Sequence, residues 1–264
     1  MRRILAFVLA FITLFALCAC DNEGNGGGKK GDAYTAHHAH LYPYASELSY
    51  DNYDYEVVIG DAKAELVQIS YEADTNDDGA YTAVEKTRMT GTVKLEDGYY
   101  VISVKKIYNS VKISGAGANA YKNEMIQNAR DAIAGINKDN PNYKNYVARY
   151  ELIIDLYSGK EVDATAVSLS EFGTAVYKVK LSEEFKKIAE MQLIADGKLM
   201  EEYTFEYDAS GKLTYSAETD SAGDKWETEY RANGTPSAFK YTSNGEVMNF
   251  ICDENGTVTE IAED

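Results

Sequence analysis

The sequence predicts a mainly β protein of the α+β class, with antiparallel strands, one helix near residues 120–136 and a C-terminal β-meander. Apolar residues alternate with polar ones over much of residues 41–115, and again over residues 146–156 and 175–181. Helical spacing replaces this alternation near residue 120, and glycines recur regularly in the last third of the chain. Alternation is typical of strands, whereas apolar residues three or four positions apart share one face of a helix.

The first predicted strands lie between residues 41 and 115. Val67, Ile69 and Tyr71 alternate with polar residues, as in a half-buried strand. Further along, the pair Asp97–Gly98 separates two segments rich in strand-forming residues, and this pair is typical of a tight hairpin turn. We therefore expect antiparallel hairpins in this part of the chain.

The predicted helix covers residues 120–136. Asn119 is suited to cap its N-terminus, and Asn137 followed by Pro141 ends it. Its apolar residues at helical spacing are Tyr121, Met125, Ala129, Ala132, Ile133 and Ile136. The alternating segments at residues 146–156 and 175–181 then predict that strands resume, while residues 183–192 fit either a helix or a strand.

The last third of the chain contains an internal repeat. Glycines that end short polar turns recur at intervals of 11 or 12 residues, at Gly211, Gly223, Gly234, Gly245 and Gly256. Strands of about seven residues joined by such turns predict an up-and-down antiparallel meander. Aromatic residues alternate with acidic ones in its strands, so one face is expected to be aromatic and the other acidic.

The segment YTFEYDASGKL, residues 203–213, resembles the YD repeat of bacterial surface proteins. The shared pattern is Tyr, any residue, Tyr, Asp, two residues, Gly, a basic residue and Leu. Later turns keep the glycine but lose the tyrosine or the aspartate, and the resemblance covers at most residues 190–264. It implies a surface-exposed β architecture and brings no catalytic residues with it.

The N-terminus has the features of a secretory signal. Arg2 and Arg3 precede an apolar run of 14 residues, which is shorter than the roughly 20 residues that a membrane-spanning helix needs. The run ends in LCAC at residues 17–20, which resembles the lipobox of bacterial lipoproteins. The resemblance implies cleavage after residue 19, acylation of Cys20 with palmitate among its lipids, and anchoring on the extracytoplasmic side of the cell membrane. An ordinary signal peptide with soluble release is the alternative.

Processing at this site divides the chain into segments. Residues 1–19 are the predicted signal peptide, and residues 20–40 are the lipidated cysteine with a flexible tether that is rich in glycine and charge. Residues 41–181 are expected to form a β-rich domain with one helix, and residues 182–264 the meander, either separately or as one continuous domain. Only Cys20 and Cys252 remain after processing, which excludes an intramolecular disulfide.

The formal net charge of −17 restricts the partners. It disfavours nucleic acid, because affinity for the phosphates comes mainly from Lys and Arg. It also disfavours adhesion to anionic lipid headgroups, which leaves the N-terminal lipid as the membrane contact.

All three histidines, His37, His38 and His40, lie just before the first predicted strand. Two imidazoles at this spacing suit zinc or copper, but Glu47 or Asp51 would have to complete the ligand set. We favour the interpretation that this stretch is a solvated polar segment. Because no histidine follows residue 40, catalytic arrangements of the Ser-His-Asp or Cys-His type are disfavoured.

These features favour a non-enzymatic binding or interaction module at the cell surface, with a glycan or a peptide as ligand. Five tyrosines between residues 42 and 55 could stack against such a ligand, although tyrosines more often serve as sheet formers. Two alternatives are a glycan hydrolase that uses two carboxylates and a carrier of apolar cargo inside a curved sheet. The shape and lining of the largest concave surface distinguish the three.

Residues 74–85, DTNDDGAYTAVE, match the calcium-loop pattern of EF-hand proteins. In that pattern Asp74, Asn76 and Asp78 supply side-chain oxygens, Ala80 a backbone carbonyl, and Glu85 one or two carboxylate oxygens. EF-hand loops join two helices, whereas strands are expected on both sides of this loop. An acidic hairpin tip is therefore the favoured interpretation, and a calcium site is the alternative.

Calorimetric titration with millimolar calcium tests this loop. If the site exists, calcium binding should be measurable but weak, because an isolated loop lacks the paired helices of an EF-hand. Asp78→Ala removes one ligand and should abolish the heat. The absence of heat, or the same heat from Asp78→Ala, would reject the site.

Overall fold

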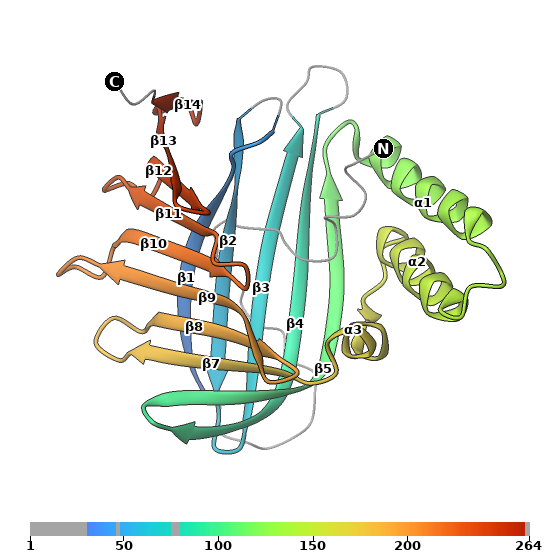
Figure 1. Cartoon of the computed structure of the whole chain (residues 1–264), viewed down its shortest axis with the longest axis horizontal. Helices are drawn as coiled ribbons and strands as arrows, with labels where there is room; N and C mark the ends of the chain where they lie inside the picture. Colours follow the sequence, from blue (N-terminus) through green and yellow to red (C-terminus); the bar gives the residue numbers. More distant parts are fainter. Residues whose placement is uncertain (1–30, 46–47, 75–79, 262–264) are drawn as a thin grey trace.

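The computed structural model describes residues 31–45, 48–74 and 80–261, and this part contains a 14-stranded sheet and three helices (Figure 1). The first half of the sheet consists of long antiparallel strands. They are β1 (Asp32–Tyr42), β2 (Ser49–Ile59), β3 (Lys63–Asp74), β4 (Tyr81–Glu96) and β5 (Tyr99–Ser114). Each strand pairs with the next one in sequence, so successive hairpins build this layer.

The second half of the sheet is antiparallel and runs across the first half (Figure 1). Its strands are β7 (Ala175–Ser182), β8 (Lys187–Ala195), β9 (Lys198–Tyr207), β10 (Leu213–Asp220), β11 (Lys225–Tyr230), β12 (Pro236–Ser243), β13 (Glu246–Cys252) and β14 (Val258–Ile261). The repeated glycines end its turns. In the turn after β11, Gly234 has a φ of 87° and its N–H donates to the Arg231 carbonyl.

Strand β1 closes the first half of the sheet against the second. It pairs with β2 along its length and makes a short parallel contact with β8, where Thr35 lies opposite Lys187. The Lys187 ammonium group donates to the Thr35 hydroxyl at 3.0 Å. Strands β1–β5, β7 and β8 thereby form a seven-stranded mixed barrel, and the meander β9–β14 continues from it.

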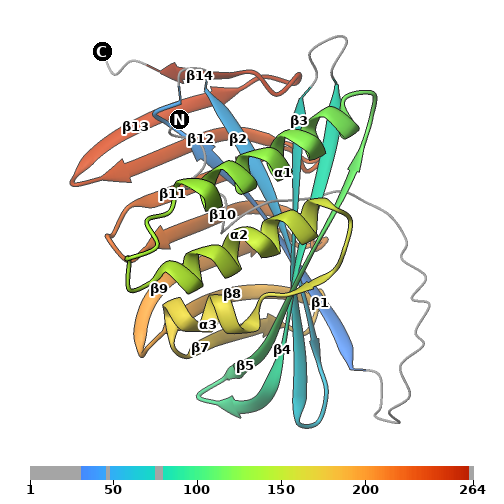
Figure 2. The same ribbon diagram turned by 90° about the vertical axis from the view of Figure 1, so that its right-hand side faces the viewer.

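Three helices lie between β5 and β7 in the chain, and Figure 2 shows them side by side. They are α1 (Ala118–Gly135), α2 (Tyr143–Tyr157) and α3 (Thr165–Phe172). The short strand β6 (Val162–Asp163) pairs with β5 between α2 and α3. The helices fit here because β5 pairs with β7 only over residues 100–103, so the rest of β5 diverges from β7.

The main core lies between the two halves of the sheet. Tyr55 of β2 packs against Tyr203 and Phe205 of β9, and all three side chains are buried. A second apolar cluster joins the end of β1 to the meander, and a third joins β4 and β5 to α1 and α2. The aromatic face predicted for the meander is therefore part of the core.

The predicted fold class is confirmed. The protein is mainly β with antiparallel strands, α1 lies within two residues of the predicted helix, and the chain ends in a meander. Most of residues 183–192, which fitted either a helix or a strand, belong to strand β8. The sheet continues through residue 182, because β7 and β8 pair across this position.

The strand predicted at residues 146–156 is wrong, because these residues belong to helix α2. Apolar residues are so dense here that they also recur three or four positions apart, at Tyr146, Tyr150, Ile153 and Tyr157. Both periods therefore fit the sequence. Packing of α2 against α1 and β5 selects the helix.

The tether predicted for residues 20–40 is shorter than expected. Strand β1 begins at Asp32, so residues 32–40 and all three histidines belong to a paired strand. The polar composition of this strand led to the prediction of a tether. Histidines are nevertheless accommodated in the strand, because partners from other strands form hydrogen bonds with their ring nitrogens. Asp54 of β2 binds His37, and Ser216 of β10 binds His38.

Gly91 tests the close pairing of β4 with β5. It lies at a β-bulge, where a Cβ atom would overlap the backbone carbonyl of Ser103. We expect Gly91→Ala to lower the free energy of unfolding by roughly 2 kcal/mol, as overpacking does. The control is Gly135→Ala in α1, where the Cβ position is open and we expect a gain of roughly 0.5–1 kcal/mol. Equal effects in chemical denaturation would contradict this pairing.

Candidate functional site

A cavity of about 190 Å³ lies where β5 diverges from β7. Its walls come from strands β3, β4 and β5, from strands β7, β8 and β9, and from all three helices. Apolar cavities of about 150 Å³ are large enough to bind a benzene molecule. This cavity can therefore hold a small organic molecule or a segment of an acyl chain.

Most of the cavity wall is apolar. Helix α2 contributes several residues, because its side chains at helical spacing face the sheet. The apolar lining includes Met89, Ile107, Leu152, Ile153, Leu156 and Leu193. Met89 and Ile107 also belong to the main core, so the cavity is continuous with the packed interior of the barrel.

Two buried polar atoms of the lining residues have no hydrogen-bond partner among the residues that the structure describes. They are the hydroxyl oxygen of Ser70 in β3 and the side-chain carbonyl oxygen of Asn109 in β5. An unpartnered buried polar group costs about 1–3 kcal/mol of stability. A bound molecule would remove that cost if its own donor or acceptor reached these atoms through a side-chain movement at the cavity wall.

Glu85 of β4 also lines the cavity. The Tyr157 hydroxyl donates to its Oε1 atom at 2.7 Å. Burial raises the pKa of Glu85 to about 7; the hydrogen bond from Tyr157 opposes this rise, and the negative charge of Glu72 adds to it. The Tyr121 hydroxyl donates to Glu72 at 2.6 Å. The carboxyl group of Glu85 therefore changes its charge near neutral pH.

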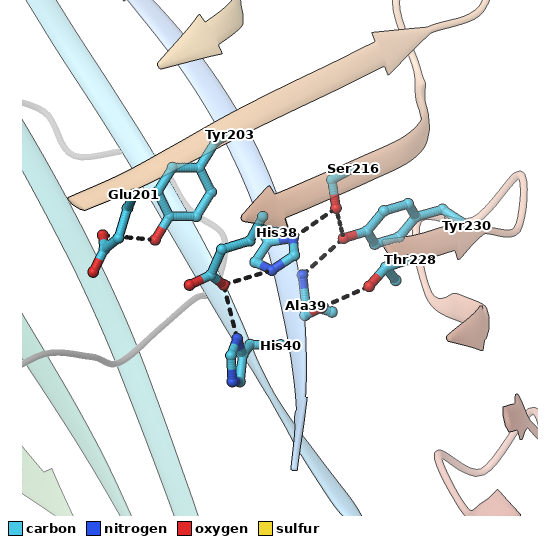
Figure 3. A network of polar contacts seen from close by, with 9 residues as sticks. His38, Ala39, His40, Glu201, Tyr203, Ser216, Thr228 and Tyr230 are labelled. Carbon is cyan, nitrogen blue, oxygen red and sulfur yellow. Dashed lines mark hydrogen bonds and ion pairs between the residues drawn. The ribbon is translucent and has the colours of Figure 1, made fainter. Parts of the chain in front are cut away.

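Glu201 of β9 lines another part of the wall and lies close to a second group of polar residues (Figure 3). The Tyr203 hydroxyl donates to its Oε2 atom at 3.0 Å. Burial raises the pKa of Glu201 to about 7, and the negative charge of Glu218 adds to this rise.

The second polar group consists of His38 and His40 of β1, both labelled in Figure 3, and Glu218 of β10. His38 Nε2 and His40 Nδ1 lie 3.1 and 2.8 Å from the same Glu218 oxygen, Oε2. Burial alone would raise the pKa of Glu218, but hydrogen bonds from both histidines hold it well below its usual range. Burial lowers the pKa of His38, and the hydrogen bond to Glu218 opposes that change.

The other ring nitrogen of His38 joins a chain of hydroxyl groups. His38 Nδ1 lies 2.8 Å from Ser216 Oγ, which lies 2.8 Å from the Tyr230 hydroxyl. That hydroxyl accepts a hydrogen bond from the Ala39 N–H at 2.8 Å, and the Thr228 hydroxyl donates to the Ala39 carbonyl at 2.6 Å (Figure 3). These contacts fix both the ring of His38 and the backbone beside it.

Sequence analysis singled out the histidines but missed Glu218. This residue takes the place that we expected Glu47 or Asp51 to take. Glu47 lies outside the described residues, and burial raises the pKa of Asp51 to about 7 although a hydrogen bond from Tyr42 opposes the rise. Glu218 follows His38 by 180 residues, so no local pattern connects the two.

Of the predicted calcium ligands, Asp74 ends β3 and Glu85 lies in β4. Asn76 and Asp78 lie outside the described residues, and so does the side chain of Asp74. The Ala80 carbonyl accepts a hydrogen bond from the Gly117 N–H at 3.0 Å. The Glu85 carboxylate contacts helix α2, as described above. Calcium binding by this loop stays a prediction.

Comparison with protein-family models and with curated proteins finds no match for this chain. In the part of the chain that the structure describes, the helices are too short or too polar to cross a bilayer. Cys20, the predicted lipidation site, lies outside that part.

Glu85→Gln tests the titratable charge in the cavity wall. Because the folded-state pKa of Glu85 is raised to about 7, its contribution to stability is lost as the pH rises from the ordinary glutamate pKa through 7. Glutamine cannot ionise and can still accept from Tyr157. We expect the variant and wild type to melt within about 2 °C of each other at pH 5, and the variant to melt about 4 °C or more above wild type at pH 8.

The matched control is Glu96→Gln, at the exposed end of the same strand. It should shift the melting temperature equally at both pH values. If Glu85→Gln behaves like this control in calorimetric melts, the buried charge assigned to Glu85 is refuted.

Proposed function

We propose that this chain is a non-enzymatic binding protein, and that its cavity holds a small, largely apolar ligand with at least one hydrogen-bonding group. One observation carries the proposal: a largely apolar cavity bordered by Ser70 and Asn109, two residues whose side chains each carry a buried polar atom without a partner in the described part of the chain. Ligand pockets are typically apolar with a few polar groups that orient the ligand. The proposal corresponds to the carrier of apolar cargo in a curved sheet.

The exposed surface supports this choice over a glycan or peptide ligand. Stacking on sugars requires accessible aromatic rings. Of the five tyrosines in the tyrosine-rich segment only Tyr44 is largely exposed, whereas Tyr53 and Tyr55 are buried in the main core, as are Tyr203 and Phe205 of the meander. Their rings stabilise the barrel and are not available to a ligand at the surface.

The cavity also favours binding over glycan hydrolysis. Glu85 and Glu201, two carboxylates of its lining, each accept a hydrogen bond from a tyrosine hydroxyl. Burial raises the pKa of both groups to about 7, so their surroundings do not make one carboxyl group the acid and the other the base. General acid–base catalysis on a glycoside instead needs two carboxyl groups whose pKa values differ.

We further propose that the binding domain is held at the extracytoplasmic face of a cell membrane by lipid on Cys20. The LCAC motif and the apolar run before it support this placement. Residues 21–31 then separate the lipid from the first residue of β1. A carrier in this position would meet apolar molecules that partition between the membrane and water.

Calorimetric titration with 1-octanol tests the proposed cavity. Octanol combines an eight-carbon chain with one hydroxyl, and we expect it to bind with a dissociation constant below about 1 mM. Leu152→Trp fills the cavity from α2 and should weaken binding at least tenfold. Tyr146→Trp is the matched control, because Tyr146 lies on the same helix but is 41% exposed and should tolerate the change.

Ser70→Ala separates polar recognition from simple burial. The variant should bind octanol about tenfold more weakly, because the lost hydrogen bond is worth about 1.4 kcal/mol. Its stability without ligand should not fall, since the hydroxyl that is removed has no partner in the described structure. Failure of wild type to bind octanol, or equal affinities of Leu152→Trp and Tyr146→Trp, would contradict the proposal.

A further inference from the structure

We infer that His38, His40 and Glu218 bind a divalent transition metal of the zinc class, at a site distinct from the ligand cavity. One donor atom of each side chain lies within 4.8 Å of the other two. Two of these atoms are imidazole nitrogens and the third is a carboxylate oxygen. Zinc accepts this ligand set in sites that leave a fourth position for water.

The distances between the donor atoms are close to those of a metal site. In a tetrahedral zinc site with bonds of about 2.0–2.1 Å, neighbouring ligand atoms lie roughly 3.4 Å apart. Glu218 Oε2 lies 3.1 Å from His38 Nε2 and 2.8 Å from His40 Nδ1. The two imidazole nitrogens lie within 4.8 Å of each other, so an ion would enter as the flexible glutamate side chain retracts and the imidazole rings adjust.

Strand geometry holds the two histidines in position. His38 and His40 are two residues apart in β1, so their side chains point to the same face of the strand. His37 occupies the alternate position, and its Nδ1 lies 2.8 Å from Asp54 of β2. The three histidines therefore provide two candidate ligands and one internal control.

Ser216 can stabilise the form of His38 that binds a metal. A metal at Nε2 requires the proton on Nδ1, and metal-bound histidines usually donate that N–H to an acceptor. Ser216 Oγ lies 2.8 Å away and can accept it, because the Ser216 hydroxyl can rotate and donate to the Tyr230 hydroxyl. Without metal, Ser216 can instead donate to Nδ1 while Nε2 donates to Glu218. The same side chains satisfy both states.

The surroundings are electrostatically suited to a cation, and an ion can reach them. Glu201 and Asp51 both interact electrostatically with His40. Their carboxyl groups supply further negative charge when they ionise, and a bound cation would favour that ionisation. The side chain of His38 is fully buried, whereas those of His40 and Glu218 are 15% and 12% exposed. An ion would therefore enter from the side of His40.

Trp226 provides a direct measurement of metal binding. It is the only tryptophan of the chain, and its ring centroid lies 4.7 Å from that of His40. In the full-length protein, purified without a histidine tag, we expect Cu²⁺ to quench the Trp226 fluorescence and Zn²⁺ to reverse the quenching by competition. Calorimetry should give one Zn²⁺ per chain with micromolar or tighter affinity. Excess Ca²⁺ should not compete, because it prefers oxygen ligands.

Three variants identify the ligands. Glu218→Gln and His40→Ala should each weaken zinc binding at least about tenfold. His37→Ala removes the adjacent histidine on the other face and should leave the affinity unchanged. Circular dichroism and thermal melting check that each variant is folded.

A measurement on the wild-type protein avoids any dependence on the variants. X-ray absorption of the zinc complex should show two imidazole ligands, and the Co²⁺ complex should show the intense visible bands of four-coordinate cobalt. The inference is overturned if wild type binds no zinc, if the zinc complex lacks imidazole ligands, or if His37→Ala weakens binding as much as His40→Ala. Unchanged affinity in Glu218→Gln would remove Glu218 from the site.

Discussion

Hydrogen bonds from tyrosine hydroxyls to carboxylates hold the barrel and its helices together. The chain has 43 acidic residues against 26 basic ones, so ion pairs cannot satisfy every carboxylate near the core. Its 22 tyrosines can place their rings in the apolar interior and their hydroxyls at its edge. Such bonds link distant segments: they run from Tyr34 to Glu183, from Tyr121 to Glu72 and from Tyr157 to Glu85.

A tyrosine partner leaves a buried carboxyl group in a different state from a lysine partner. Burial alone would raise the pKa of Glu227, but Lys225 and Lys240 are among the groups that hold it at about 2. Glu85 receives a hydrogen bond from neutral Tyr157, and burial keeps its pKa near 7. The helices that fill the gap between β5 and β7 cover Glu85 of β4, and this carboxyl group thereby becomes a titratable group in the wall of an apolar cavity. The cavity and the raised pKa of Glu85 therefore both result from the insertion of helices α1–α3 between β5 and β7.

Local sequence patterns predicted the elements whose partners are close in the chain. Hairpins pair most strands with the next one, so alternation and turn glycines identified them, and helical spacing identified α1. Prediction failed where contacts between residues far apart in the chain determine the local structure. Strand β1 is polar because β10 satisfies His38, and α2 carries a pattern that also fits a strand. The cavity and the position of Glu218 depend on tertiary packing, which no local period encodes.

The polar contacts of β1 also set its register in the barrel. On one side β1 pairs with β2 over 11 residues, but on the other it makes a single parallel pair with β8. A shift of one residue would turn His38 and His40 to the opposite face, so that Glu218 would lose at least one of its two imidazole partners to apolar Ala39. Because a buried carboxylate without its partner is strongly destabilising, this register is selected. Side chains of β1 point alternately to its two faces. This alternation fixes the register of the strand and also brings the imidazoles of His38 and His40 to one oxygen of Glu218.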